Sequence, residues 1–486
     1  MVSFVYRQPR IANHSQPFDP PLPGRNFNAT LPTSRLFTQG NSKISGYGTQ
    51  SSLSICTTAN RLYSTAAAHD VQATPEPLKS SIELPESNAD ESRVAIGWPD
   101  GTWSRFHHFW LRDHCRCPHC FHPVTKQRML DTFALPPSLY PKTVVSKPEG
   151  LEVTWPTSPP HVSVYPWQWL RHNSYDPRTE PMSIAGQSPP PPIQEKILWG
   201  SGIVRDPPTV AYEDVMSDDL AVLKWLEKID QFGFCFVSGV PATTENTEKL
   251  ITRINFIRHT QYGGFWDFTS DLAHGDTAYT NLALPAHTDN SYFTDPCGLQ
   301  VFHLLSHERG TGGQTLLVDG FYAASILKEL HPESYDLLSK ILVPTHSAGD
   351  EDYLYRARPL SGNPILQHDP LNKDLLVQVR YANDHRSAMR NLHPSEVIPW
   401  YEALRNWNRC LTSSDSEFWV QLNAGTVVVV DNHRVLHGRS AFSGKRRMCG
   451  AYIGLDDWRA KLDALRGRFS SAGSQIKERS VWDVAF

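Results

Sequence analysis

The sequence lacks the run of 18 or more apolar residues that a membrane-spanning helix needs, and no internal repeat stands out. It also lacks a basic stripe, since 46 Lys and Arg stand against 50 Asp and Glu, for a formal net charge of -4. Binding to nucleic acid depends on many phosphate contacts by Lys and Arg. The sequence therefore predicts neither a membrane span nor a nucleic-acid partner.

Cysteine is scarce, with eight residues among 486. Three of them crowd into positions 115, 117 and 120, which is closer than the framework of a disulfide-stapled secreted fold requires, so we expect a reducing compartment. Apolar residues reach 40%, and 14 Trp are present. This composition indicates a globular protein with a sizeable core, long enough for two domains.

The amino-terminal residues 1–68 are rich in Ser, Asn, Thr, Pro and Arg and poor in acids, the profile of a transit peptide. The first 63 residues contain the single acid Asp19 and six basic residues: Arg7, Arg10, Arg25, Arg35, Lys43 and Arg61. The stretch Arg61-Leu62-Tyr63-Ser64 resembles a mitochondrial processing site. We predict a mitochondrial matrix protein; the alternative is a disordered tail without an address, on a cytoplasmic protein.

Residues 80–175 form a predicted small β-rich domain, because strand-like runs occur at 93–98 and 150–155. A Pro-rich linker is predicted at 176–200, since Ser188 is followed by four prolines. The remaining residues, 201–486, are predicted to form one larger domain.

Apolar spacing in the larger domain predicts a helix over 218–231 that ends at Gly233, a second from Asp319 to before Pro332, and a third near 395–411. Short strands are predicted at 234–238, 299–304, 314–318, 418–422 and 426–430. Many short strands with inserted helices favour a mainly β fold, a distorted double-stranded β-helix of the jelly-roll class.

The triplet His287-Thr288-Asp289 places two metal-binding side chains on one face of a strand. A distant second His would complete two imidazoles and one carboxylate, which leave three positions open on Fe(II). His437 is the candidate. Spacing alone does not decide, because His274-Gly275-Asp276 repeats the triplet and His433 rivals His437.

Four longer stretches resemble the family of trimethyllysine and γ-butyrobetaine dioxygenases, which depend on Fe(II) and 2-oxoglutarate. They are Trp110–Arg128 (WLRDHCRCPHCFHPVTKQR), His287–His303 (HTDNSYFTDPCGLQVFH), Gly310–Ala324 (GTGGQTLLVDGFYAA) and Asp431–Arg439 (DNHRVLHGR). The resemblance implies that His287, Asp289 and His437 hold iron. His433 stands where the family is expected to have Trp, and Asn290 and Ser291 stand where Thr is expected.

The same resemblance assigns the co-substrate and substrate contacts. A fixed cation should bind the distal carboxylate of 2-oxoglutarate, a task that suits the fork of Arg. Arg446 takes this role by resemblance, with Thr315 as its hydroxyl partner. Ascorbate is the expected reductant. A trimethylammonium group cannot donate hydrogen bonds and needs aromatic faces. The implied cage is Tyr262, Trp266, Tyr279 and Tyr452, with Asp276 for an α-ammonium group and Asn383 for an α-carboxylate.

Cys115, Cys117 and Cys120 supply three soft ligands, and a tetrahedral structural zinc needs one more. The resemblance offers His161, whereas His114, His119 and His122 lie nearer in the sequence. Such a site would stabilise a small domain with a thin core. In the family this domain supports a homodimer, which we therefore expect.

These features predict an enzyme that hydroxylates N6-trimethyl-L-lysine at C3, the first step of carnitine biosynthesis. The alternative within the class is hydroxylation of γ-butyrobetaine. A different class, a module that binds trimethyllysine without turning it over, remains open, although an intact iron triad together with Arg446 supports it poorly.

Overall fold

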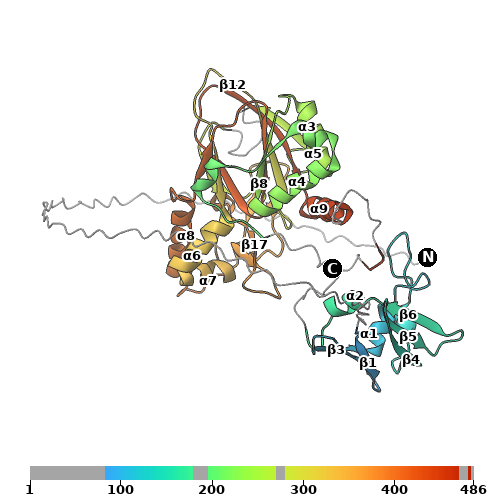
Figure 1. Cartoon of the computed structure of the whole chain (residues 1–486). Coiled ribbons are helices and arrows are strands. Elements are labelled where there is room, and N and C mark those ends of the chain that lie inside the picture. The colour runs from blue at the N-terminus through green and yellow to red at the C-terminus, as the bar shows by residue number, and fades with distance from the viewer. Residues whose placement is uncertain (1–82, 179–194, 270–279, 470–479, 483–486) are drawn as a thin grey trace, which may run out of the picture. The chain divides into compact units, whose positions relative to one another are not determined.

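The computed structural model describes residues 83–178, 195–269, 280–469 and 480–482 (Figure 1). All the described residues belong to one compact unit of the chain, Ser80–Phe486. The predicted transit segment, 1–68, lies outside the described residues, as do positions 179–194 of the predicted linker and the two candidates Asp276 and Tyr279.

The N-terminal module, which we define as residues 83–178, contains two antiparallel three-stranded sheets. Their strands are β1 Glu86–Ala89, β2 Arg93–Gly97, β3 Trp103–His107, β4 Thr143–Lys147, β5 Gly150–Trp155 and β6 His161–Tyr165. One short helix follows the third strand of each sheet: α1 His108–Asp113 follows β3, and α2 Trp167–His172 follows β6. In β2 and β3 buried and half-buried positions alternate, as expected for strands with one face on a core.

Aromatic side chains fill much of the core of this module, and Trp155 and Tyr165 are fully buried there. The indole N–H of Trp155 donates to Ser163 Oγ at 2.9 Å, so the buried ring leaves no polar atom without a partner. Trp482, near the carboxyl end, packs against this core, with its ring centroid 5.1 Å from that of Trp169.

The rest of the described chain builds two facing sheets. In the larger, seven-stranded sheet the order is β10-β21-β12-β19-β8-β7, with β9 on β21; in the smaller it is β11-β20-β13-β18. The strands are β7 Thr209–Ala211, β8 Phe234–Ser238, β9 Ile257–Arg258, β10 Phe265–Thr269, β11 Leu284–His287, β12 Leu299–Glu308, β13 Thr315–Asp319, β18 Phe418–Val420, β19 Thr426–Asp431, β20 Val435–Arg439 and β21 Lys445–Ile453. Two small hairpins are β14 His346–Ser347 with β15 Tyr355–Arg356, and β16 Leu366–His368 with β17 Leu376–Val379. The predicted jelly-roll class is confirmed.

Helices cover the outer faces of both sheets (Figure 1). Those packed with the larger sheet are α3 Tyr212–Ser217, α4 Asp219–Phe232, α5 Thr244–Ile254 and α9 Leu455–Phe469, and those packed with the smaller are α6 Gly320–Leu330, α7 Pro332–Lys340 and α8 Val397–Leu411. A third core lies between the sheets, where Phe234, Leu317 and Val430 are fully buried.

Local sequence signals explain the central elements. Asp218 caps α4 by accepting from Leu220 N at 3.1 Å, and Gly233 ends the helix at a left-handed φ of 79°. The run of four Val in β19 is buried on both faces, because the inter-sheet core lies on one side and α4 on the other.

A buried ion pair joins several of these elements. The guanidinium of Arg434 donates to both oxygens of Asp319, at 3.0 and 2.7 Å, and neither side chain is more than 2% exposed. Asp319 also accepts from the Phe321 and Trp199 N–H groups, at 3.0 and 3.1 Å. This carboxylate therefore fixes the end of β13, the start of α6 and the segment that contains Trp199.

Candidate active site and metal centres

His287, Asp289 and His437 converge at one edge of the smaller sheet. His287 ends β11 and lies directly opposite His437 of the neighbouring strand β20. Asp289 Oδ1 lies 3.3 Å from His287 Nε2 and 3.8 Å from His437 Nε2, and one ligand atom of each residue lies within 4.8 Å of the others. The pairing of two strands thus brings together residues 150 positions apart.

The protonation of these groups suits a cation. Burial lowers the pKa of His437 to about 3, so its imidazole is neutral near pH 7. His287 Nδ1 lies 2.8 Å from the Pro285 carbonyl oxygen, a contact that turns Nε2 toward Asp289. Burial raises the pKa of the Asp289 carboxyl, but the hydrogen bonds from His287 and Tyr452 oppose it, and that pKa stays below its usual range. Two imidazoles and one carboxylate in this arrangement fit Fe(II).

Of the two rivals to this set, only His433 belongs to the described residues. His433 is in the turn between β19 and β20, with Nε2 3.3 Å from the Pro296 carbonyl oxygen, and is not part of the cluster. The second triplet, His274-Gly275-Asp276, lies outside the described residues.

Three side chains hold Asp289 in place through hydrogen bonds. These contacts were not predicted from the sequence. Tyr452 OH donates to Asp289 Oδ2 at 2.7 Å, and Gln300 Nε2 donates to the same oxygen. Asn432 fixes the backbone, because its Oδ1 accepts from Asp289 N at 2.7 Å and its Nδ2 donates to Asp289 O at 3.0 Å. Spacing along the chain gives no signal for these contacts, which cross from other strands and turns.

Asn290, where Thr was expected, follows Asp289 with a positive φ of 51°. Asn tolerates this left-handed conformation far better than a β-branched residue such as Thr. Its Oδ1 also accepts from the Cys297 thiol at 2.8 Å. The departure from the expected residue therefore has a local structural reason.

A cavity of about 1050 Å³ opens beside the cluster. Its walls include the three clustered residues and the predicted contacts Tyr262, Trp266, Asn383, Thr315, Arg446 and Tyr452. The structure thus brings all described members of the predicted site to one cavity, slightly larger than most small-molecule pockets.

Aromatic rings form one wall of the cavity. The ring centroids of Trp266 and Tyr452 lie 6.4 Å apart, and Tyr262 OH lies 3.2 Å from Tyr292 OH. Gly450 makes room for Trp266, since any side chain at position 450 would collide with its ring. Tyr452 belongs to both parts of the site: it lines the cavity, and its hydroxyl donates to Asp289.

Arg446 provides a buried positive charge in the same cavity, with 6% of its surface exposed. Its guanidinium lies 5.6 Å from the Phe442 ring centroid, and its Nε is buried without a hydrogen-bond partner among the described residues. Burial lowers the pKa of Arg446 to about 10, which leaves it charged at neutral pH. A buried cation of this kind suits a carboxylate ligand.

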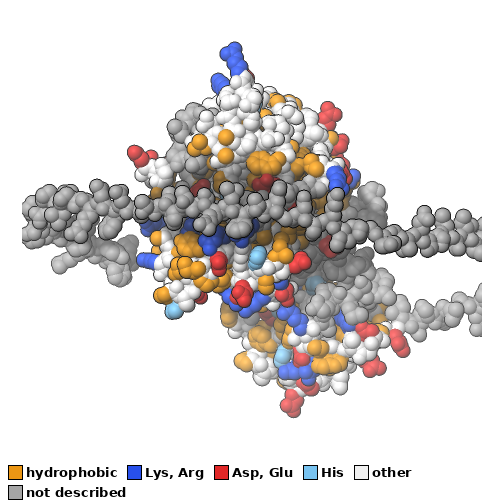
Figure 2. All heavy atoms as spheres, turned by 90° about the vertical axis from the view of Figure 1, so that its left-hand side faces the viewer, with side chains coloured by type: hydrophobic (Ala, Val, Ile, Leu, Met, Phe, Trp, Pro, Cys, Tyr) orange, Lys and Arg blue, Asp and Glu red, His pale blue; other side chains and the backbone are white. Residues whose placement is uncertain are grey.

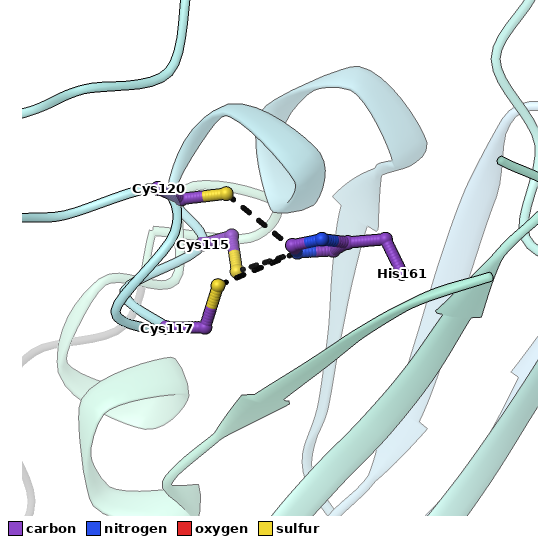
Figure 3. Close-up of side chains that lie close together, drawn as sticks. All are labelled: Cys115, Cys117, Cys120 and His161. Atoms are coloured by element: carbon purple, nitrogen blue, oxygen red, sulfur yellow. Dashed lines mark hydrogen bonds between the residues drawn. The ribbon is translucent and has the colours of Figure 1, made fainter. Parts of the chain in front are cut away.

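The second cluster lies in the N-terminal module, where Cys115, Cys117 and Cys120 surround His161 of β6 (Figure 3). Their Sγ atoms lie 3.3, 3.6 and 3.6 Å from His161 Nε2. Hydrogen bonds from Cys115 and from Arg112 (Nη1 to Cys120 Sγ, 3.2 Å) lower the pKa of the Cys120 thiol to about 5. Three sulfurs and one imidazole nitrogen match a tetrahedral zinc site.

The nearer histidines are turned elsewhere. His114 Nδ1 lies 2.8 Å from the Trp110 carbonyl oxygen, and His122 Nδ1 accepts from Thr125 N at 3.1 Å. His119 is exposed and outside the cluster. The fourth position next to the three cysteines thus belongs to His161.

The double-sheet fold and a His/Asp/His cluster beside a cavity define a class, the non-haem iron oxygenases. Residues 192–452 match the model of the "Taurine catabolism dioxygenase TauD, TfdA family", and residues 86–171 match "Gamma-butyrobetaine hydroxylase-like, N-terminal".

Curated relatives narrow this class. A trimethyllysine dioxygenase of Meyerozyma guilliermondii is 40% identical over 80% of this chain and 97% of its own length. The mitochondrial trimethyllysine dioxygenase of Homo sapiens is 43% identical over 73% of this chain and 82% of its own. The human γ-butyrobetaine dioxygenase is 28% identical over 80% and 99%. The chain belongs to the TauD, TfdA family of dioxygenases and, within it, to the trimethyllysine dioxygenase group. The predicted Fe(II)- and 2-oxoglutarate-dependent class is confirmed.

A further expectation concerns membranes. In the described ranges no helix is both long and apolar enough to cross a bilayer.

Proposed function

We propose that this protein hydroxylates N6-trimethyl-L-lysine at C3. The observation that carries the proposal is the position of the His287/Asp289/His437 cluster beside a cavity with an aromatic wall and a buried arginine. The relatives named trimethyllysine dioxygenase support the choice of substrate.

His287, Asp289 and His437 would hold the iron, and Arg446 with Thr315 would hold the distal carboxylate of 2-oxoglutarate. Iron(II) with 2-oxoglutarate and O2 supplies an oxidant that replaces one C–H hydrogen by hydroxyl and leaves succinate and CO2. Ascorbate would keep the iron reduced. The chain's own task is to hold the correct carbon of the substrate at the open face of the cluster and to exclude other reactions.

The trimethylammonium group would lie against Tyr262, Trp266 and Tyr452, with Tyr279 as a fourth ring. A fixed cation over such rings gains about 0.5 to 2 kcal/mol for each good contact. Asp276 would bind the α-ammonium group and Asn383 the α-carboxylate. The α-ammonium group distinguishes trimethyllysine from γ-butyrobetaine.

The three cysteines and His161 would hold a structural zinc that contributes folding energy to the N-terminal module. We further propose the domain limits 80–175 and 201–486, a transit peptide over 1–68, the mitochondrial matrix as location, and a homodimer. Vertebrate relatives are named mitochondrial, which supports the location.

The test is turnover of purified protein with Fe(II), ascorbate, 2-oxoglutarate and O2, offered trimethyllysine and γ-butyrobetaine together and followed by mass spectrometry. We expect trimethyllysine to gain one oxygen, matched by one succinate. Gain on γ-butyrobetaine alone would reject the substrate assignment. Tight binding without any product would favour the non-catalytic module.

A further inference from the structure

The turn at residues 383–386 presents charged groups to the cavity. Asn383, Asp384 and Arg386 all line it, and a short 3₁₀ helix, Asn383–His385, sets their spacing. Arg386 Nη2 donates to Asn383 Oδ1 and Nη1 donates to Tyr401 OH, both at the long distance of 3.4 Å. Arg386 Nε is buried without a hydrogen-bond partner among the described residues. The guanidinium therefore keeps donor capacity for a ligand.

Backbone contacts fix this turn beside the iron cluster. Thr288, between the two predicted iron ligands His287 and Asp289, donates from its N–H to Tyr381 O at 2.7 Å, and its Oγ1 accepts from Tyr381 N at 2.9 Å. Further along, His385 Nδ1 lies 3.0 Å from Ser291 Oγ. The strand that holds the cluster and the turn that ends in Arg386 are thus held in one arrangement.

A row of rings connects the turn to the aromatic wall. The His385 ring lies 4.7 Å from that of Tyr292, whose hydroxyl lies 3.2 Å from Tyr262 OH. A ligand with its cationic head among the rings and a chain of several carbons would extend past Tyr292 toward Arg386. Tyr292 and His385 thus connect the aromatic wall to the turn.

Other arginines around the cavity are engaged or differently placed. Arg439 donates to the carbonyl oxygens of Thr280 and Leu282, at 2.7 and 2.9 Å. Arg409 donates to Asn406 Oδ1 at 3.0 Å, and Arg405 lies 4.0 Å from Glu402 on the exposed face of α8. Figure 2 shows Lys and Arg side chains gathered on the face that carries α6, α7 and α8. The guanidinium of Arg386 lies over the Trp400 and Tyr401 rings, 5.3 and 5.6 Å from their centroids, and has no acidic partner within ion-pair distance among the described residues.

We propose that Arg386 binds the α-carboxylate of an α-amino acid substrate, with Asn383 as its neutral partner. The inference rests on the proposed function and adds to it the residue that recognises the far end of the substrate. An amide alone leaves a buried carboxylate without a counter-charge, whereas a guanidinium offers paired N–H donors and the opposite charge. Asp384 places a negative charge in the same turn, so the turn carries both signs of charge, as a zwitterionic amino acid requires.

The test compares two substrates on two variants. Trimethyllysine and its decarboxylated analogue, (5-aminopentyl)trimethylammonium, differ only in the carboxylate. Arg386→Met keeps an unbranched, flexible stem and removes the guanidinium with its charge. We expect kcat/KM for trimethyllysine to fall roughly 10- to 100-fold, the size of a lost charged hydrogen bond, and kcat/KM for the analogue to change less than about twofold. Arg386→Lys should recover part of the loss.

Arg390→Met is the matched control, because Arg390 is exposed, lies four residues after Arg386 and is not among the residues that line the cavity. Calorimetric binding of trimethyllysine to each full-length variant should weaken only for Arg386→Met. Equal losses on both substrates, or unchanged trimethyllysine turnover, would overturn the role of Arg386. Wild-type protein that turns over neither substrate would instead reject the proposed function.

Discussion

The two ligand clusters in the described part of the chain differ in chemistry and in surroundings. In the N-terminal module three sulfurs and one imidazole lie within 4.8 Å of one another, and Cys115 and Cys120 are 3% exposed. In the double-sheet region two imidazoles and one carboxylate lie equally close, but they form part of the wall of a cavity of about 1050 Å³.

The difference matches the roles that we propose for the two clusters, a structural zinc site and a catalytic iron site. Three thiolates and one imidazole would complete the tetrahedral shell of zinc and leave no position for a substrate. Three harder ligands leave half of an octahedral iron shell open, and the cavity gives small molecules access to it. Loss of the first cluster should therefore lower stability, and loss of the second should remove activity.

The largest effect is expected for Asp289→Asn. The change keeps the shape of the side chain but removes the charged ligand, so the loss of trimethyllysine turnover should exceed the roughly 10- to 100-fold loss seen for groups that only support ligands. Thermal unfolding should shift by no more than a few degrees. Activity and melting temperature are compared with those of Asp336→Asn, which alters an exposed pair with Lys340. Retained turnover would contradict the iron assignment.

The second prediction reverses this pattern in the other cluster. Cys117→Ser should remove stoichiometric zinc and destabilise the N-terminal module by several kcal/mol, since metal binding becomes folding energy. Zinc content by mass spectrometry and hydrogen exchange in β5 and β6 measure the effect. Cys410→Ser, a buried cysteine in α8, is the control and should keep zinc. Full zinc content in Cys117→Ser would count against the site.

Much of the fold follows from local signals. The apolar run of β19, and the helical spacing that ends at Gly233, predict β19 and α4 to within one residue. Strand β21 was not predicted, because its sequence KRRMCGAYI combines an exposed basic start with a buried apolar end and shows no clean alternation. Its place between β10 and β12 is decided by pairing with distant segments.

The site shows the same limit. Spacing offered His433 and His437 equally, and the choice depends on the register that sets His437 opposite His287. The supports Gln300 and Asn432 reach Asp289 from β12 and from the turn after β19. Contacts between segments more than ten residues apart have no fixed spacing in the sequence, so only the folded chain reveals them.

The third prediction concerns Tyr452, which lines the proposed substrate cavity and also donates a hydrogen bond to the predicted iron ligand Asp289. Tyr452→Phe keeps the ring but removes the hydroxyl that donates to Asp289 Oδ2 at 2.7 Å. We expect Fe(II) affinity or turnover to fall roughly 10- to 100-fold, with trimethyllysine binding changed less than about threefold. Iron titration and calorimetry measure the two quantities separately. Weakened trimethyllysine binding at unchanged iron affinity would mean that the hydroxyl acts on the substrate instead.

The smallest effect is expected for His303, a buried histidine outside both described clusters, and it concerns the free energy of unfolding. His303 on β12 is fully buried; its Nε2 accepts from Gly425 N at 3.2 Å, so its Nδ1–H donates to Thr247 Oγ1 at 2.7 Å. Protonation would place a second N–H against that of Gly425, and burial lowers the pKa of His303 to about 4.

The pH dependence of stability follows from this pKa. Between the usual histidine pKa of about 6.5 and 4 the unfolded chain binds a proton that the folded chain does not, so this contribution to stability is lost as pH falls through that range. His303→Gln should flatten the slope of unfolding free energy against pH by up to about one proton. Urea unfolding from pH 7 to pH 4.5 measures the slope, and His331→Gln, at an exposed position, should leave it unchanged. An unaltered slope in His303→Gln would show that His303 is protonated in the fold, in conflict with its two hydrogen bonds.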